Sequence, residues 1–162
     1  MSEQQIRIND QVTVGSQPNP AELEQLARHG YKSVINLRTS GEVDDELTPD
    51  EEGDQVKALG MQYVNIPVSM DDADETTVDR FRQNLNRMPK PVYVHCARGK
   101  RAGAMTMMDV GVKQDMDGEE VLEKAEDMGF ECDQEQLEQF VRSYVDDHTS
   151  DEPSVGKQAP RS

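Results

Sequence analysis

The sequence of 162 residues is short of the residue types that build large cores. It has no tryptophan, and leucine, isoleucine, valine and phenylalanine together number only 31, or about 19%. Lysine and arginine number 17 against 33 aspartates and glutamates, which gives a net charge of −16. Few core-forming residues combined with a high net charge border on the composition of disordered chains. We therefore expect a modest core, and the length predicts one domain.

Three further absences narrow the class of protein. An acidic chain with few basic residues repels phosphate backbones, which argues against a general nucleic-acid binder. No apolar run approaches the roughly 18–20 residues of a membrane span, and residues 1–10 contain no apolar segment of the kind found in secretory signals. Two cysteines, Cys96 and Cys132, do not make a disulfide framework, so we expect a reduced, cytoplasmic protein.

The hydrophobic residues that are present follow strand and helix periods in turn. The pattern predicts a short hairpin and three buried strands, at residues 6–14, 33–37, 62–66 and 92–95. It also predicts six helices, at residues 20–29, 49–59, 75–87, 102–111, 117–128 and 134–146. Strands that alternate with helices predict an α/β fold, with a mostly parallel central sheet and helices on both faces.

The domain is expected to cover residues 1–146. Residues 147–162 have the composition of turns and tails, and we expect a disordered C-terminal tail there.

Residues 42–54 carry eight acidic side chains. A calcium loop is one alternative for this run, but the glycine and the order of ligands that such a loop requires are missing. The favoured interpretation is a solvated run of charge. Histidines His29, His95 and His148 are far apart and lack the spacing of metal ligands, so we expect neither a metal nor a cofactor.

The most informative segment is Cys96–Arg101, between the strand 92–95 and the helix after it. A tight turn there directs backbone N–H groups into one concavity, and the helix dipole adds to this anion site. N–H groups and nearby arginine favour the thiolate form of a cysteine. A buried structural cysteine is the alternative, but three basic residues within five of Cys96 favour a nucleophile. Cys132 has no such neighbours, and a structural role is favoured for it.

This segment resembles the signature loop of the cysteine-dependent phosphatases, the protein tyrosine and dual-specificity phosphatases. The shared features are His95-Cys96, the central Gly99 and Arg101, between an apolar strand and a helix. Residues 15–18, 34–38 and 63–68 also resemble the bacterial phosphatase-like domain found beside β-lactamase-like hydrolases. The resemblance implies a tyrosine-phosphatase-like fold and the hydrolysis of phosphomonoesters through a phosphocysteine.

In this mechanism the thiolate of Cys96 attacks phosphorus, Arg101 binds the equatorial oxygens, and an aspartic acid protonates the leaving oxygen. Asp71, Asp72 and Asp74 are the candidates for the acid; Asp72 is favoured, because Asp74 suits a helix cap. The resemblance places His95 where it orients the loop and influences the thiolate. The residues expected to contact substrate are His95, Ala97, Arg98, Gly99 and Lys100.

Two departures from the family pattern keep other functions open. The familiar spacing is C-x5-R, but Arg101 lies one position early, and neither Ala102 nor Gly103 supplies the hydroxyl that usually follows the arginine. The shorter loop also resembles that of rhodanese-type sulfurtransferases, which use a cysteine persulfide. A phosphate-binding pseudophosphatase is the third possibility.

The expected partner is a phosphorylated substrate, either a phosphoprotein or a small phosphomonoester. Arg98 and Lys100 either attract anions generally or indicate a substrate with more than one phosphate, such as a phosphoinositide. Arg38 either binds substrate or pairs with the acidic residues 42–54, and the pairing is favoured.

Overall fold

The structure is a computed structural model, and it describes residues 5–39, 47–69, 74–96, 100–128 and 135–149. The chain forms two compact units, residues 1–102 and 103–162.

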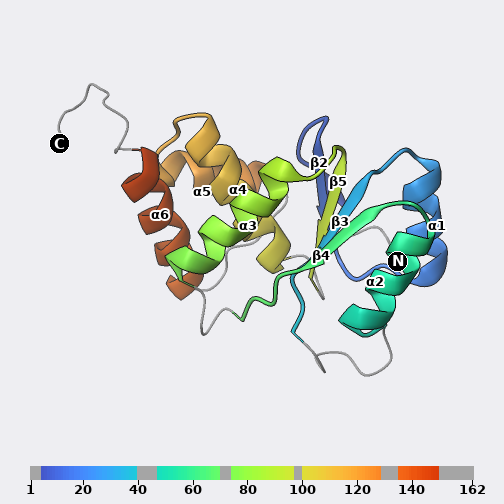
Figure 1. The fold of residues 1–162 in the computed structure, drawn as a ribbon. Helices are drawn as coiled ribbons and strands as arrows, with labels where there is room; N and C mark the ends of the chain where they lie inside the picture. Colours follow the sequence, from blue (N-terminus) through green and yellow to red (C-terminus); the bar gives the residue numbers. More distant parts are fainter. Residues whose placement is uncertain (1–4, 40–46, 70–73, 97–99, 129–134, 150–162) are drawn as a thin grey trace. The chain divides into compact units, whose positions relative to one another are not determined.

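The first unit is built on a five-stranded sheet (Figure 1). The strands lie in the order β1-β2-β5-β3-β4; β1 is antiparallel to β2, and the other neighbours are parallel. This confirms the mostly parallel sheet. The strands are β1 (Ile6–Arg7), β2 (Val12–Gly15), β3 (Ser33–Asn36), β4 (Gln62–Asn65) and β5 (Val92–His95).

Three helices of this unit flank the sheet: α1 (Pro20–Arg28), α2 (Pro49–Ala58) and α3 (Glu75–Arg87). Figure 1 shows α1 and α2 on one side of the sheet and α3 on the other. Asn19 and Thr48 begin α1 and α2 with capping boxes, each followed by proline, as the sequence predicts.

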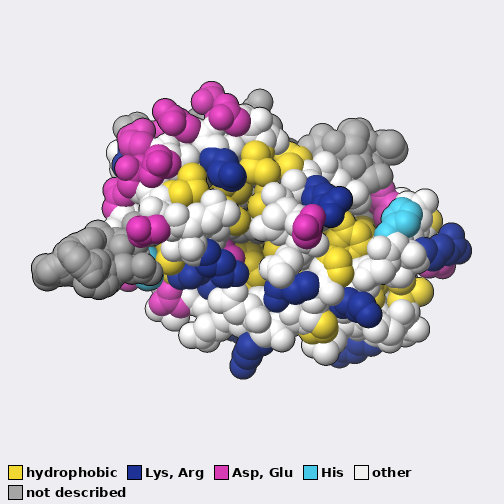
Figure 2. Space-filling model, turned by 90° about the horizontal axis from the view of Figure 1, so that it is seen from above, with side chains coloured by type: hydrophobic (Ala, Val, Ile, Leu, Met, Phe, Trp, Pro, Cys, Tyr) yellow, Lys and Arg dark blue, Asp and Glu magenta, His cyan; other side chains and the backbone are white. Residues whose placement is uncertain are grey.

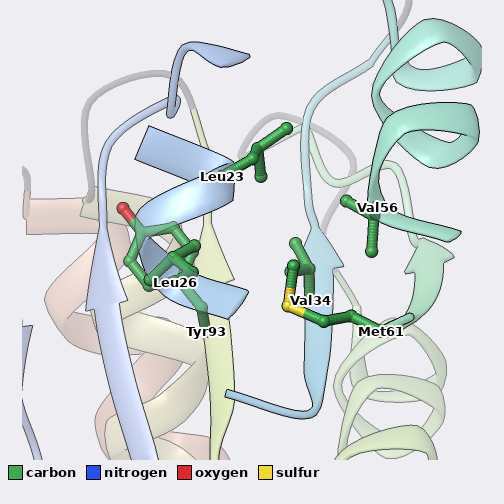
Figure 3. Packing of buried hydrophobic residues seen from close by; sticks show 6 residues of the cluster. All are labelled: Leu23, Leu26, Val34, Val56, Met61 and Tyr93. Carbon is green, nitrogen blue, oxygen red and sulfur yellow. The ribbon is translucent and has the colours of Figure 1, made fainter. Parts of the chain in front are cut away.

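The core between the sheet and helices α1 and α2 is small and apolar (Figure 3). Val34 on β3 and Tyr93 on β5 lie opposite each other in register, so both side chains point to the same face. Helices α1 and α2 cover that face. We call the buried set the apolar cluster; it consists of Leu23, Leu26, Val34, Val56, Met61 and Tyr93.

The carboxyl ends of β3, β4 and β5 meet at one edge of the sheet, and backbone hydrogen bonds extend the pairing beyond the strands. The Leu37 N–H donates to the His95 carbonyl at 2.8 Å, and the Val68 N–H donates to the Leu37 carbonyl at 3.0 Å. The segments that follow these strands are therefore held next to one another. Parallel α/β sheets bind ligands at this edge.

The second unit is helical. Helix α4 (Lys100–Lys113) begins in the first unit and runs into the second, followed by α5 (Gly118–Asp127) and α6 (Glu135–Thr149). Helices α5 and α6 pack together, and the Gly118 N–H donates to Asp146 Oδ1 at 2.7 Å. Helix α6 ends three residues beyond the expected domain boundary at residue 146.

The negative charge is unevenly distributed. Helix α5 exposes five acidic side chains, Glu119, Glu120, Glu123, Glu126 and Asp127. In Figure 2 the acidic side chains gather over one region, while lysine and arginine are dispersed over the rest of that face. In the described ranges, no helix combines the length and the hydropathy needed to cross a bilayer.

Candidate active site

Cys96 directly follows β5 and is buried, with 1% of its surface exposed. Its Sγ accepts a hydrogen bond from the backbone N–H of Ala102 at 3.4 Å. Helix α4 begins at Lys100, two residues earlier than the sequence predicts, so this N–H belongs to the first turn of the helix. The sulfur thus lies at a helix N-terminus, where the N–H groups and the dipole of the helix stabilise negative charge.

Arg101 links the segments that follow β4 and β5. Its Nη1 donates to the carbonyl oxygen of Val68 at 2.8 Å. This bond fixes one edge of the planar guanidinium against the segment that follows β4. The fork of N–H groups on a guanidinium matches two oxygens of a phosphate.

His95 is fully buried, and its ring is bound on both sides. Nε2 lies 2.5 Å from Glu52 Oε2, and Nδ1 lies 3.4 Å from the carbonyl oxygen of Cys96. The ring of Tyr93 stacks on the imidazole with a centroid distance of 5.8 Å. The side chain of His95 therefore points toward α2 and away from solvent, an arrangement that suits orientation of the loop.

Glu52 is the centre of a group of buried and half-buried polar side chains that we call the polar network: Gln17, Asn36, Glu52, Tyr63 and His95. Gln17 Nε2 donates to Glu52 Oε1 at 2.8 Å, and Asn36 Nδ2 lies 3.5 Å from the same oxygen. Asn36 Nδ2 also donates to the Tyr63 hydroxyl at 3.0 Å, and that hydroxyl donates to the Pro49 carbonyl at 2.8 Å. Burial, followed by the charge of Glu52, raises the pKa of the Tyr63 phenol.

Gly53 leaves the space that the ring of Tyr63 occupies in the polar network. A side-chain carbon at this position would lie 2.9 Å from the ring of Tyr63, closer than such atoms approach. The absence of a side chain lets the phenol lie against α2, where it reaches Pro49.

For Glu52, the interpretation of residues 42–54 as a solvated run of charge is wrong. Its side chain is fully buried, whereas Asp50, Glu51 and Asp54 on the same helix are exposed. The helical period explains the difference, because Glu52 and the buried Val56 lie four residues apart on one face of α2. The sequence itself carries only the apolar Val56 one turn after Glu52; the burial of that valine is a property of the packed helix.

Arg38 is also buried, at 1% exposure. Its Nη2 donates to the carbonyl oxygen of Leu47, and its Nε has no partner in the described part of the chain. Arg38 thus binds the backbone just after the acidic residues 42–46, which lie outside the described residues.

Asp74 caps helix α3, as the sequence predicts. Its Oδ1 accepts hydrogen bonds from the backbone N–H and the hydroxyl of Thr77, both at 2.9 Å. These bonds lower the pKa of the Asp74 carboxyl. The other predicted site residues Asp71, Asp72, Ala97, Arg98 and Gly99, and the side chain of Lys100, lie outside the described residues. Over the ranges that the structure covers, histidine, cysteine and carboxylate side chains do not gather in a group able to hold a metal ion.

Comparison with protein families matches residues 2–148 to PTP-NADK, described as "DSP-PTPase phosphatase fused to NAD+ Kinase". The match covers almost the whole chain. The chain belongs to this phosphatase family. The resemblance predicted from the segment around Cys96 is thereby confirmed at the level of the family.

Curated relatives carry this domain within longer chains. The chain is 34% identical over 124 residues to a β-lactamase hydrolase-like protein of Agrobacterium fabrum, and 30% identical to one of Xylella fastidiosa. Each match covers 76% of this chain and 28% of the relative. The chain therefore spans little more than a quarter of the length of these relatives.

Solved structures confirm the fold. TpbA of Pseudomonas aeruginosa matches with a TM-score of 0.72 at 22% identity, over 90% of this chain and 88% of TpbA. The catalytic domain of the PP-IP phosphatase SIW14 from Saccharomyces cerevisiae matches with a TM-score of 0.72 at 19% identity, over 94% of this chain and 92% of that domain. The tyrosine-phosphatase-like α/β fold predicted from the sequence is confirmed.

Proposed function

We propose that the chain is a phosphomonoester hydrolase that acts through a phosphocysteine at Cys96. The observation that carries the proposal is the hydrogen bond from the Ala102 N–H, in the first turn of α4, to Cys96 Sγ. It places the sulfur at a helix N-terminus, where negative charge is stabilised both on a thiolate and on a bound phosphate. Membership of the phosphatase family supports the same reaction.

In the first step the Cys96 thiolate attacks phosphorus. The S–P bond forms, the bond from phosphorus to the ester oxygen breaks, and the leaving oxygen takes a proton from an aspartic acid, for which Asp72 is proposed. Arg101 binds the equatorial oxygens with N–H groups of its guanidinium, while its bond to the Val68 carbonyl holds the fork in place.

In the second step water attacks the phosphocysteine. The S–P bond breaks, the aspartate accepts a proton from the water, and inorganic phosphate and the thiolate are released. The hydroxyl that usually follows the arginine is missing at Ala102 and Gly103. The Ala102 N–H, bound to Sγ, supplies a hydrogen bond to the departing sulfur in its place.

The proposed substrate is an exposed phosphate group on a protein or a small molecule. TpbA has been crystallised with phosphotyrosine, and SIW14 is a PP-IP phosphatase. An aryl phosphate is therefore the appropriate first probe. We propose a cytoplasmic location, because a free catalytic thiol stays reduced there.

One observation favours a second candidate, a sulfurtransferase. The loop from Cys96 to Arg101 is one residue shorter than the usual phosphatase loop. The shorter loop encloses less space, which accommodates a persulfide sulfur more easily than a tetrahedral phosphate. This function predicts thiocyanate formation from thiosulfate and cyanide. If no thiocyanate forms while an aryl phosphate is hydrolysed, the sulfurtransferase function is excluded.

The replacement Cys96→Ser tests the nucleophile. We expect steady-state hydrolysis of an aryl phosphate to fall on the order of 10³-fold or more, because a serine hydroxyl lacks an adjacent base to activate it. Vanadate should inhibit the unmodified chain. The matched control is Cys132→Ser, which should retain activity. Folded protein that binds phosphate without turning over any aryl phosphate at pH 5–7 would indicate a pseudophosphatase.

The replacement Asp72→Asn tests the general acid. We expect kcat to fall by about 10²–10³-fold on an alkyl phosphate and by much less on an aryl phosphate with a good leaving group, since only the poor leaving group needs the proton. The control is Asp74→Asn, which keeps an N-cap residue on α3 while removing the carboxylate. An equal loss for both leaving groups, or a larger loss in Asp74→Asn, contradicts the assignment.

A further inference from the structure

Glu52 is a buried carboxylate 44 positions before the cysteine in the chain, and it reaches the cysteine through one intermediate side chain. Its Oε2 lies 2.5 Å from His95 Nε2, and His95 Nδ1 lies 3.4 Å from the carbonyl oxygen of Cys96. Neither Glu52 nor His95 exposes side-chain surface. No solvent therefore competes for these bonds.

The partners of His95 fix where its protons lie. A carbonyl oxygen can only accept a hydrogen bond, so Nδ1 carries a proton if the contact with Cys96 is a hydrogen bond. One further proton lies between Nε2 and Glu52. The pair is therefore an imidazolium beside a carboxylate, or a neutral imidazole beside a protonated glutamic acid.

The groups around the pair are ones that a carboxylate and an imidazolium can bind. Oε1 of Glu52 faces amide donors from Gln17 and Asn36, and hydrogen bonds to a carboxylate stabilise its charge. Glu52 also lies in the first turn of α2, where the helix dipole favours an anion. On the other side, the ring of Tyr93 lies 5.8 Å from the imidazole, within the range of a cation–π contact.

We propose that Glu52 is a positioning residue for Cys96: it holds His95 as an imidazolium whose Nδ1–H is directed at the Cys96 carbonyl, and so favours the thiolate. The link from His95 to Cys96 is the contact of Nδ1 with the Cys96 carbonyl oxygen at 3.4 Å, whereas Glu52 contacts only the far nitrogen of the same ring. Removal of the Glu52 charge leaves a buried imidazolium uncompensated, so His95 loses its proton and the thiolate loses a nearby positive charge. The catalytic relevance of this arrangement rests on the proposed function.

The other groups near His95 do not titrate in the range of the test. Burial is the main cause that raises the pKa of both Tyr63 and Tyr93, so these phenols stay protonated near neutral pH. The guanidinium groups of Arg38 and Arg101 keep their charge. Asp50, whose charge acts on Tyr63, is exposed on the first turn of α2.

The test is the pH dependence of iodoacetamide alkylation in a Cys132→Ser background, in which Cys96 is the single thiol. We expect Glu52→Gln to move the midpoint of the alkylation profile upward by about one pH unit, the lower end of the effect of a neighbouring charge. Asp54→Asn removes an exposed carboxylate from the same helix and serves as the matched control; its midpoint should stay in place. An unmoved midpoint in folded Glu52→Gln overturns the proposal.

Two further variants make the test independent of the folding of Glu52→Gln. Gln17→Met removes one donor to Glu52 and also the side-chain oxygen Oε1 of Gln17, which is buried without a partner among the described residues. It should move the alkylation midpoint in the same direction by a smaller amount. An unchanged midpoint in Gln17→Met would contradict the proposal. If Glu52 acts through His95, the double variant Glu52→Gln with His95→Asn should match His95→Asn alone, whereas additive shifts contradict the mechanism.

Turnover of an aryl phosphate, measured on the same samples, separates the two proposals. A chain without turnover whose alkylation midpoint still depends on Glu52 refutes the proposed function and leaves the positioning role standing. Normal turnover, together with an alkylation midpoint that does not change in Glu52→Gln, refutes the positioning role alone.

Discussion

Glu52 and Val56 lie one turn apart on the same buried face of α2, yet they belong to different environments. Val56 packs into the apolar cluster with Leu23 and Val34, while Glu52 lies in the polar network beside His95. The apolar cluster gains free energy by removing surface from water. A buried ion pair gains little, because desolvation offsets its attraction. One sheet face therefore has an apolar part that supplies stability and a polar edge beside Cys96, where we propose that the chemistry takes place.

The largest effect on stability is expected in the apolar cluster. Leu23→Ala removes a fully buried side chain on α1, and we expect it to lower the free energy of unfolding by about 2–5 kcal/mol. Activity per folded molecule, and the alkylation midpoint of Cys96, should not change. Denaturant unfolding and alkylation measured side by side check this. A shift of the alkylation midpoint in Leu23→Ala would show that the two environments are not separate.

A smaller effect is expected at Tyr93, which belongs to the apolar cluster through its ring and donates a hydrogen bond from its hydroxyl to the Ser16 carbonyl at 2.8 Å. Burial raises the pKa of this phenol above its ordinary value of 10.0. Above pH 10 the unfolded chain loses a phenol proton that the folded chain keeps, so stability falls as pH rises. This loss amounts to at most about 1.4 kcal/mol per pH unit.

Tyr93→Phe removes that alkaline loss. Near neutral pH the variant should be less stable by about 1 kcal/mol, the worth of one hydrogen bond. The stability difference from the unmodified chain should then shrink, or reverse, as the pH rises above 10. Urea unfolding at a series of pH values measures it. A difference that stays constant with pH would mean that the phenol ionises equally in the folded and unfolded chain.

Much of the architecture could be predicted from the sequence because it depends on local signals. The caps at Asn19 and Thr48 and the apolar periods of the strands are all contained in short stretches. The end of α6 could not be predicted in this way. Its last residues have the composition of a tail, but the helix continues to Thr149, and within it the ring of His148 stacks on Tyr144 with a centroid distance of 3.8 Å.

The residues of the candidate site that are close together in the sequence could be predicted, but the distant Glu52 could not. Cys96 and Arg101 are five residues apart and form one motif. Glu52 lies 43 residues before His95, and its neighbours in the sequence are exposed acids. Only the burial of Val56 four residues later distinguishes it from them, and that burial is a property of the packed helix.

The most direct test of the central claim is to trap the phosphoenzyme. The chain is mixed with an aryl phosphate, quenched during turnover, digested and examined by mass spectrometry. We predict one phosphate on the peptide that contains Cys96, absent in Cys96→Ser and in vanadate-treated protein. Phosphate release that persists in Cys96→Ser, or turnover with no phosphorus on Cys96, would contradict the account.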